Sequence, residues 1–209
     1  MTERTTGVKS ALKKTVLSCT AAALALSMTA CGGSDSSQGQ QEAGGASGAQ
    51  EQDRGGDMQE RSLGNISLEI PESWVPSPKE ELGGDWTEGF DDAEENPKIR
   101  VRMAPEINDS PHPDVVEGEL AARAVAGGYY GPDWEGSRRE KTEIPGAFRG
   151  YVADFTYVAG DKQMRGRWLL MTNPETYKVE TIEIAGQEDA LTDDLLDDIS
   201  DSVEMKPGK

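Results

Sequence analysis

The sequence predicts an α+β domain, in which a curved antiparallel sheet of about six or seven strands carries packed helices. Several short stretches alternate apolar and polar residues, which is typical of half-buried strands. Two other stretches repeat apolar residues every three or four positions, as amphipathic helices do. Four of the strand-like stretches follow one another with only turns between them, so they are expected to pair as antiparallel neighbours.

Three strands are expected before the first helix. Residues 65–70 alternate polar and apolar side chains and are stopped by Pro71. Residues 86–91 form the second expected strand. Residues 98–103 form the third, with Ile99, Val101 and Met103 on one face.

The first helix is expected to begin near Asp114, which can cap it, with Glu117 at the spacing of a capping box. Its apolar stripe consists of Val116, Leu120, Ala121 and Ala124. The glycines at 127–128 are expected to end this helix.

The four consecutive strands are expected at 134–144, 147–158, 163–172 and 176–185. Their turns contain Pro145-Gly146, Ala159 to Lys162, and Asn173-Pro174. The second strand places Tyr151, Ala153, Phe155 and Tyr157 on one face. The third has Trp168 and Leu170 on one face and Leu169 and Met171 on the other, which predicts that both sides of the sheet are covered.

The last element is expected to be a helix over about 188–202. Its apolar stripe is Leu191, Leu195, Leu196, Ile199 and Val203. The opposite face carries Asp193, Asp194, Asp197, Asp198 and Asp201.

The N-terminus is typical of an export signal. Basic residues precede an apolar run over 15–30, which at about 16 residues is shorter than the roughly 20 that a membrane-spanning helix needs. The run closes with Met28-Thr29-Ala30-Cys31, which resembles the lipobox of bacterial lipoproteins, with Met28 in place of the usual leucine. The resemblance implies a diacylglycerol on Cys31 and cleavage before it. The alternative is an ordinary secreted protein in which Cys31 is incidental.

The expected domain organisation has three parts. Residues 1–30 are the lipoprotein signal peptide. Residues 31–60 are the lipidated cysteine and a tether rich in Gly, Ser, Gln and Glu, which is too polar to fold. Residues 61–209 form the α+β domain. Cleavage would also remove Cys19, so the mature chain has no internal disulfide.

The order of these elements resembles the PsbP-like fold, and within it the small lipoproteins of the LpqN type. The shared features are a first strand ending in Pro-x-x-Trp (Pro71 to Trp74), a central helix, a meander of long strands and a closing helix that ends in Ser202-Val203. The resemblance implies a non-enzymatic accessory protein on the outer face of the cell membrane of a Gram-positive bacterium. It implies an envelope protein partner and no catalytic residues.

Charge argues against nucleic acid as a partner. The chain has 21 basic and 39 acidic residues, a net charge of −18, and removal of residues 1–30 would leave 17 and 38, a net charge of −21. So negative a chain repels phosphate backbones.

The sequence offers little for catalysis or metal binding, and no cofactor is expected beyond the diacylglycerol on Cys31. The chain has one histidine, His112, between two prolines, which indicates an exposed loop; a Ser-His-Asp site could form only there. A zinc site lacks ligands. The acidic clusters at 91–95 and 193–198 lack the spacing of a calcium loop and are expected to be solvated surface.

The aromatic stretch over 127–136 is the candidate binding site. Tyr129, Tyr130 and Trp134 could form a docking or ligand-binding surface, since aromatic residues with polar atoms are favoured there. Alternatively, these rings seal the edge of the core between helix and sheet. Three functions are considered: a tethered accessory protein acting by protein contact, a carrier of a lipid or other apolar small molecule, and a cell-wall hydrolase.

Overall fold

The computed structural model describes residues 57–126 and 130–208. The expected signal peptide, Cys31 and most of the expected tether lie outside these residues. In chain order the elements are β1 (Met58–Leu63), β2 (Ile66–Pro71), β3 (Val75–Pro76), α1 (Lys79–Leu82), β4 (Glu88–Asp91), β5 (Ile99–Asn108), α2 (Pro113–Ala126), β6 (Glu135–Thr142), β7 (Arg149–Ala159), β8 (Lys162–Thr172), β9 (Val179–Gln187), α3 (Asp193–Asp201) and β10 (Glu204–Met205).

A seven-stranded antiparallel sheet with the order β3-β4-β5-β9-β8-β7-β6 is the centre of the domain. The four strands after α2 pair in sequence order, because short turns place each strand antiparallel beside its predecessor. The predicted α+β class and the predicted meander are therefore confirmed.

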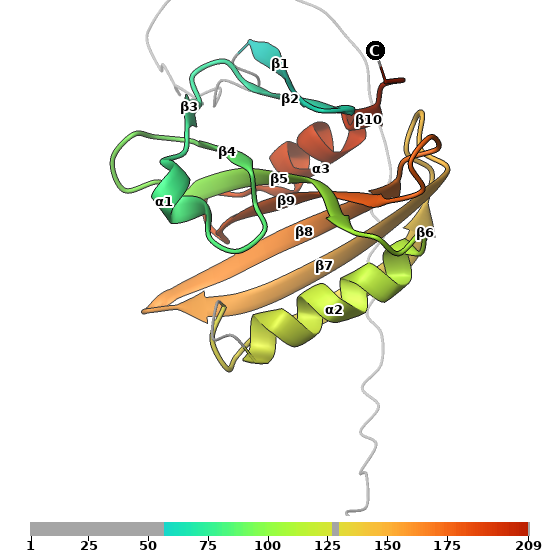
Figure 1. Ribbon diagram of the computed structural model, residues 1–209. Coiled ribbons are helices and arrows are strands. Elements are labelled where there is room, and N and C mark those ends of the chain that lie inside the picture. Colours follow the sequence, from blue (N-terminus) through green and yellow to red (C-terminus); the bar gives the residue numbers. More distant parts are fainter. Residues whose placement is uncertain (1–56, 127–129, 209) are drawn as a thin grey trace, which may run out of the picture. The chain divides into compact units, whose positions relative to one another are not determined.

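Both faces of this sheet are covered (Figure 1). The helix α2 lies on one face, and α3 lies on the other with the small sheet of β1, β2 and β10. Strand β8 confirms its predicted two-sided pattern: Trp168 and Leu170 belong to the apolar cluster beneath α2, and Leu169 and Met171 belong to the cluster beneath α3. These two clusters are the cores of the domain.

The first expected strand, 65–70, forms β2 but lies outside the seven-stranded sheet. It pairs instead with β1 and β10. Because β1 begins at Met58, residues 58–60 are part of a strand, although they were expected to end the tether. Strand β1 is largely exposed and is held by backbone pairing with β2, so its composition gives no apolar pattern to detect.

The turn Pro145-Gly146 anchors the C-terminal strand. The Met205 amide donates to the Pro145 carbonyl oxygen at 2.8 Å. Gly146 has a φ of +78°, and a Cβ there would lie 1.8 Å from the Met205 carbonyl oxygen. Only glycine allows β10 to approach this turn so closely.

Both long helices begin away from their expected first residues. Helix α2 begins at Pro113, a favoured first helical residue, so the expected cap at Asp114 is wrong. Glu117 points inward and pairs with Arg139 at 3.2 Å instead of closing a capping box. Helix α3 begins at 193 because the Thr192 side chain caps it, accepting from the Leu195 amide at 3.2 Å.

Candidate functional site

A buried polar centre lies on the face of the sheet that α2 covers. Its residues come from three adjacent strands: Glu183 on β9 is directly opposite Arg102 on β5 and directly opposite Trp168 on β8. Arg102, Glu183 and Trp168 are 3%, 2% and 1% exposed, respectively. The register of the sheet therefore places a charged pair and an indole in one row inside the protein.

The Glu183 carboxylate accepts hydrogen bonds from all its neighbours in this centre. Arg102 reaches its Oε1 with Nε at 3.0 Å and Nη2 at 2.5 Å, and Trp168 Nε1 donates to its Oε2 at 2.8 Å. The Tyr130 hydroxyl donates to the same Oε2. Arg102 also donates to the Leu82 carbonyl oxygen at 2.5 Å. A buried charge with this many partners is stabilised by them and fixes their relative positions.

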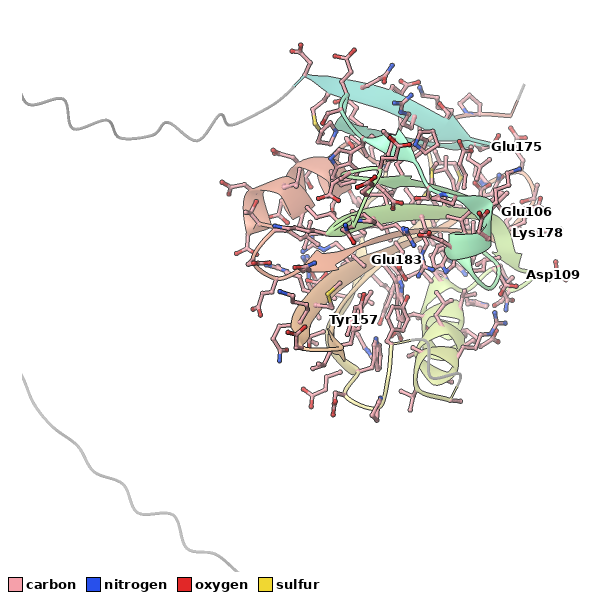
Figure 2. The ribbon with its side chains drawn as sticks, turned by 90° about the vertical axis from the view of Figure 1, so that its left-hand side faces the viewer. Glu106, Asp109, Tyr157, Glu175, Lys178 and Glu183 are labelled. Atoms are coloured by element: carbon pink, nitrogen blue, oxygen red, sulfur yellow. The ribbon has the colours of Figure 1, made fainter. Side chains whose placement is uncertain are left out.

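Two tyrosines over this centre have raised pKa values. Burial raises the pKa of Tyr130 well above its ordinary value, and the nearby Glu183 carboxylate raises it further. Burial raises the pKa of Tyr157 to about 12, with Glu183 again adding to the effect. Figure 2 shows Tyr157 and Glu183 in the same part of the domain. Both phenols are therefore neutral hydrogen-bond donors at physiological pH.

Two cavities flank the Tyr130 ring. One, of about 200 Å³, is lined by Arg102 and Glu183 together with Arg100, Tyr157 and Met164. The other, of about 190 Å³, lies between α2 and the sheet and has Trp86, Leu120 and Trp168 in its wall. Both are smaller than the roughly 300 Å³ at which ligand pockets usually begin. They have room for a small group beside the polar centre.

The predicted aromatic site is divided by the structure. Tyr129 lies outside the described residues. Tyr130 is buried and part of the polar centre, and the half-buried Trp134 stacks on Trp168 at a centroid distance of 5.8 Å. Tyr130 and Trp134 thus occupy the positions that the core-edge alternative expects, and a binding role for the stretch stays a prediction.

The other sequence candidates lie apart from this centre. His112 is exposed, as expected, and its ring lies beside a guanidinium, with Arg149 Nη1 3.0 Å from its Nδ1. Within residues 57–126 and 130–208, no three His, Cys, Asp or Glu side chains converge as metal ligands. No helix among these residues is long and apolar enough to cross a bilayer.

The acidic cluster at 91–95 corrects the expectation of a purely solvated surface. Asp91 is 3% exposed and pairs with Arg100 at 2.5 Å. Asp92 accepts from the Lys98 and Ile99 amides at 2.8 and 3.1 Å, which closes the loop before β5. These two carboxylates are structural. In the cluster at 193–198, Asp193 and Asp197 are 80% and 61% exposed, as a solvated helix face requires.

Sequence reasoning missed Arg102 and Glu183. A signal was present: both residues lie on the second face of strands in a sheet that was expected to be covered on both sides. A charged side chain on the second face of such a strand is buried and needs a partner. The sequence does not give the identity of that partner, since Arg102 and Glu183 are 81 residues apart.

Alkaline pH tests the burial of Tyr157. Since its pKa is about 10 when unfolded and about 12 in the fold, its contribution to stability is full below pH 10 and falls as pH rises toward 12. Between pH 9 and 11, we expect the free energy of unfolding of the parent protein to fall by about 1 kcal/mol more than that of Tyr157→Phe, as measured by urea denaturation. The exposed Tyr177→Phe is the matched control. If the stability of Tyr157→Phe and Tyr177→Phe depended on pH in the same way, the burial of Tyr157 would be contradicted.

The arrangement of strands and helices defines the class of this domain, which is the PsbP-like fold. The solution structure of cyanobacterial PsbP (CyanoP) from Synechocystis sp. PCC 6803 is similar, with a TM-score of 0.53 and 16% identity, over 72% of this chain and 93% of that chain. At this identity the likeness establishes the fold alone.

Two further solved structures are more distant. LpqN of Mycobacterium tuberculosis, described as involved in cell envelope biogenesis, has a TM-score of 0.43 and 15% identity over 72% of this chain and 92% of that one. The Ran-binding protein Mog1p of Saccharomyces cerevisiae has a TM-score of 0.45 and 13% identity, over 72% of this chain and 96% of that one. No family model and no curated protein matches the sequence.

Proposed function

We propose that this chain is a membrane-anchored extracytoplasmic lipoprotein that acts as a non-enzymatic accessory protein of the cell envelope, by contact with another protein. The sequence around Cys31 supports the lipid anchor, because two acyl chains hold a protein stably at a membrane. The PsbP-like fold is compatible with an accessory role. The buried polar centre supports it as well, since its charges satisfy one another within the domain.

An exposed aromatic pair carries the proposal of protein contact. Phe148, before β7, and Tyr177, in the turn between β8 and β9, are 52% and 54% exposed. Their rings meet edge to face with centroids 5.6 Å apart. Aromatic side chains are enriched at the centres of protein interfaces, where each buries a large apolar area.

The backbone holds both rings in place. The Phe148 amide donates to the Thr172 carbonyl oxygen at 2.9 Å, and the Tyr177 amide donates to the Asn173 carbonyl oxygen at 2.9 Å. The Asn173 side chain accepts from two further turn amides and donates to Glu180 at 2.7 Å. A surface that is already ordered loses little conformational entropy when it binds.

Site-specific photo-crosslinking in the native host tests the proposal. A photoreactive residue at position 148 or 177 of the full-length protein is expected to give one dominant crosslinked envelope protein, identified by mass spectrometry. Position 125, where Val125 is 53% exposed on α2, is the matched control. Crosslinks that are absent, or equal at all three positions, would reject a specific contact at the aromatic pair.

A carrier function is the second candidate, because the cavity under α2 has an apolar wall that includes Trp86 and Trp168. Its volume of about 190 Å³ limits the cargo to a small group. Native mass spectrometry of the purified protein would reveal a copurified ligand if the protein is a carrier.

A further inference from the structure

A third cavity lies at the N-terminal end of α2 and has a different chemical character. Its volume is about 400 Å³, within the usual range of ligand pockets. It lies between the segment that starts α2 and the edge of the sheet at β6 and β7. The side chains around it are mostly hydrogen-bond donors: His112, Lys141, Thr142, Arg149 and Tyr151.

The sheet register gathers Lys141, Arg149 and Tyr151 on one face. Lys141 on β6 is directly opposite Tyr151 on β7. Arg149 lies two residues before Tyr151, so both side chains leave β7 on the side of α2. His112 reaches the same place from the loop before α2 and lies against Arg149.

Lys141 and Arg149 differ from most cations of this domain because neither has a carboxylate partner among the described residues. Arg149 donates to the Pro111 carbonyl oxygen at 3.2 Å and lies 5.0 Å over the Phe148 ring. In contrast, the guanidiniums of Arg100, Arg102, Arg123, Arg138, Arg139, Arg165 and Arg167 all pair with carboxylates. In a chain with a net charge of −18, two free cations in one cavity attract an anion.

Two further groups set the local charge. His112 Nδ1 must accept from Arg149, because a guanidinium cannot accept, so its Nε2 carries a proton and is a donor. Asp114 is the opposing group: its carboxylate lines the cavity, and it is exposed. The Glu117 carboxylate also lies near Tyr151, but it is paired with Arg139 at 3.2 Å. The remaining charges still favour an anion, since Lys141 and Arg149 face only the Asp114 carboxylate within the cavity.

We propose that this cavity binds a phosphate group, with Lys141 and Arg149 as its charged ligands and the hydroxyl of Tyr151 as a further donor. A phosphate offers several acceptor oxygens at once, which suits a ring of donors from three segments. The site is separate from the aromatic pair and does not depend on the proposed partner contact.

Titration with inorganic phosphate, followed by amide chemical shifts, tests the proposal. We expect saturable shifts around residues 112–115, 141–142 and 149–151, measured against sodium chloride of equal ionic strength to remove general screening. In Lys141→Gln/Arg149→Gln, the dissociation constant is expected to rise at least about tenfold, because two charge-assisted hydrogen bonds are lost. Lys79→Gln/Lys162→Gln changes the charge equally on exposed lysines outside the cavity and is the control.

A second variant keeps the test informative if the loss of Arg149 disturbs the fold. Lys141→Gln alone breaks no side-chain hydrogen bond or ion pair among the described residues, and weaker phosphate binding is still expected. Vesicles of phosphatidylglycerol form the second arm: binding that the double variant abolishes would assign the phosphate to a lipid headgroup. Phosphate shifts that do not saturate, or that persist in the double variant, would overturn the proposal.

Discussion

Glu183→Ala is expected to lower the free energy of unfolding by about 3 to 5 kcal/mol, because it leaves the Arg102 guanidinium buried without its carboxylate. The substitution also removes the acceptor of the Trp168 and Tyr130 hydrogen bonds. A domain of this size has about 5 to 15 kcal/mol of stability in total, so the variant would lose a large part of it. Urea denaturation followed by tryptophan fluorescence measures the change.

Two comparisons distinguish the effect of an unpaired buried charge from the effect of lost contacts. The exposed Glu140→Ala, which breaks the surface pair with Arg138, is expected to cost less than about 1 kcal/mol. The double variant Arg102→Met/Glu183→Leu is expected to be more stable than Glu183→Ala, since apolar replacement of both partners leaves no unpaired charge. If Glu183→Ala were no more costly than Glu140→Ala, the polar centre would not stabilise the fold.

Cys31→Ala is expected to move the protein from the membrane to the soluble fraction, because the proposed diacylglycerol has no other attachment site. Loss of both acyl chains should reduce the membrane-bound fraction by at least roughly tenfold. The measurement is fractionation of the native host, together with metabolic labelling by a fatty acid analogue.

Cys19→Ala is the matched control for this experiment. Cys19 lies in the apolar run of the expected signal peptide and would be removed with it, so its replacement should leave membrane association unchanged. A Cys31→Ala protein that stays with the membrane, or a parent protein that takes up no fatty acid, would refute the lipid anchor.

The order of the elements from β4 to α3 could be predicted because it depends on local patterns. The meander from β6 to β9 follows from alternating side chains and short turns, and the α2 stripe follows from apolar residues at helical spacing. Strand β1 could not be predicted, since its exposed side chains carry no apolar pattern and β2 holds it by backbone pairing. The same pairing assigns β2 to the small sheet.

The candidate sites were less accessible to sequence reasoning. The aromatic stretch was found, because clustered rings stand out, but Tyr130 donates its hydrogen bond to Glu183, more than fifty residues later. The phosphate cavity was missed entirely. Its two cations belong to neighbouring strands, and only the pairing of β6 with β7 places them on the same side as the start of α2.

The sequence by itself determined the class of fold, the order of the elements from β4 to α3, and the two-sided cover of β8, because these depend on the spacing of apolar residues along the chain. The tertiary structure alone decided which charges are buried and which are free. Arg102 and Glu183 meet, and Lys141 and Arg149 keep no carboxylate partner within the described residues, because strand register and helix placement set distances between side chains that are remote in sequence.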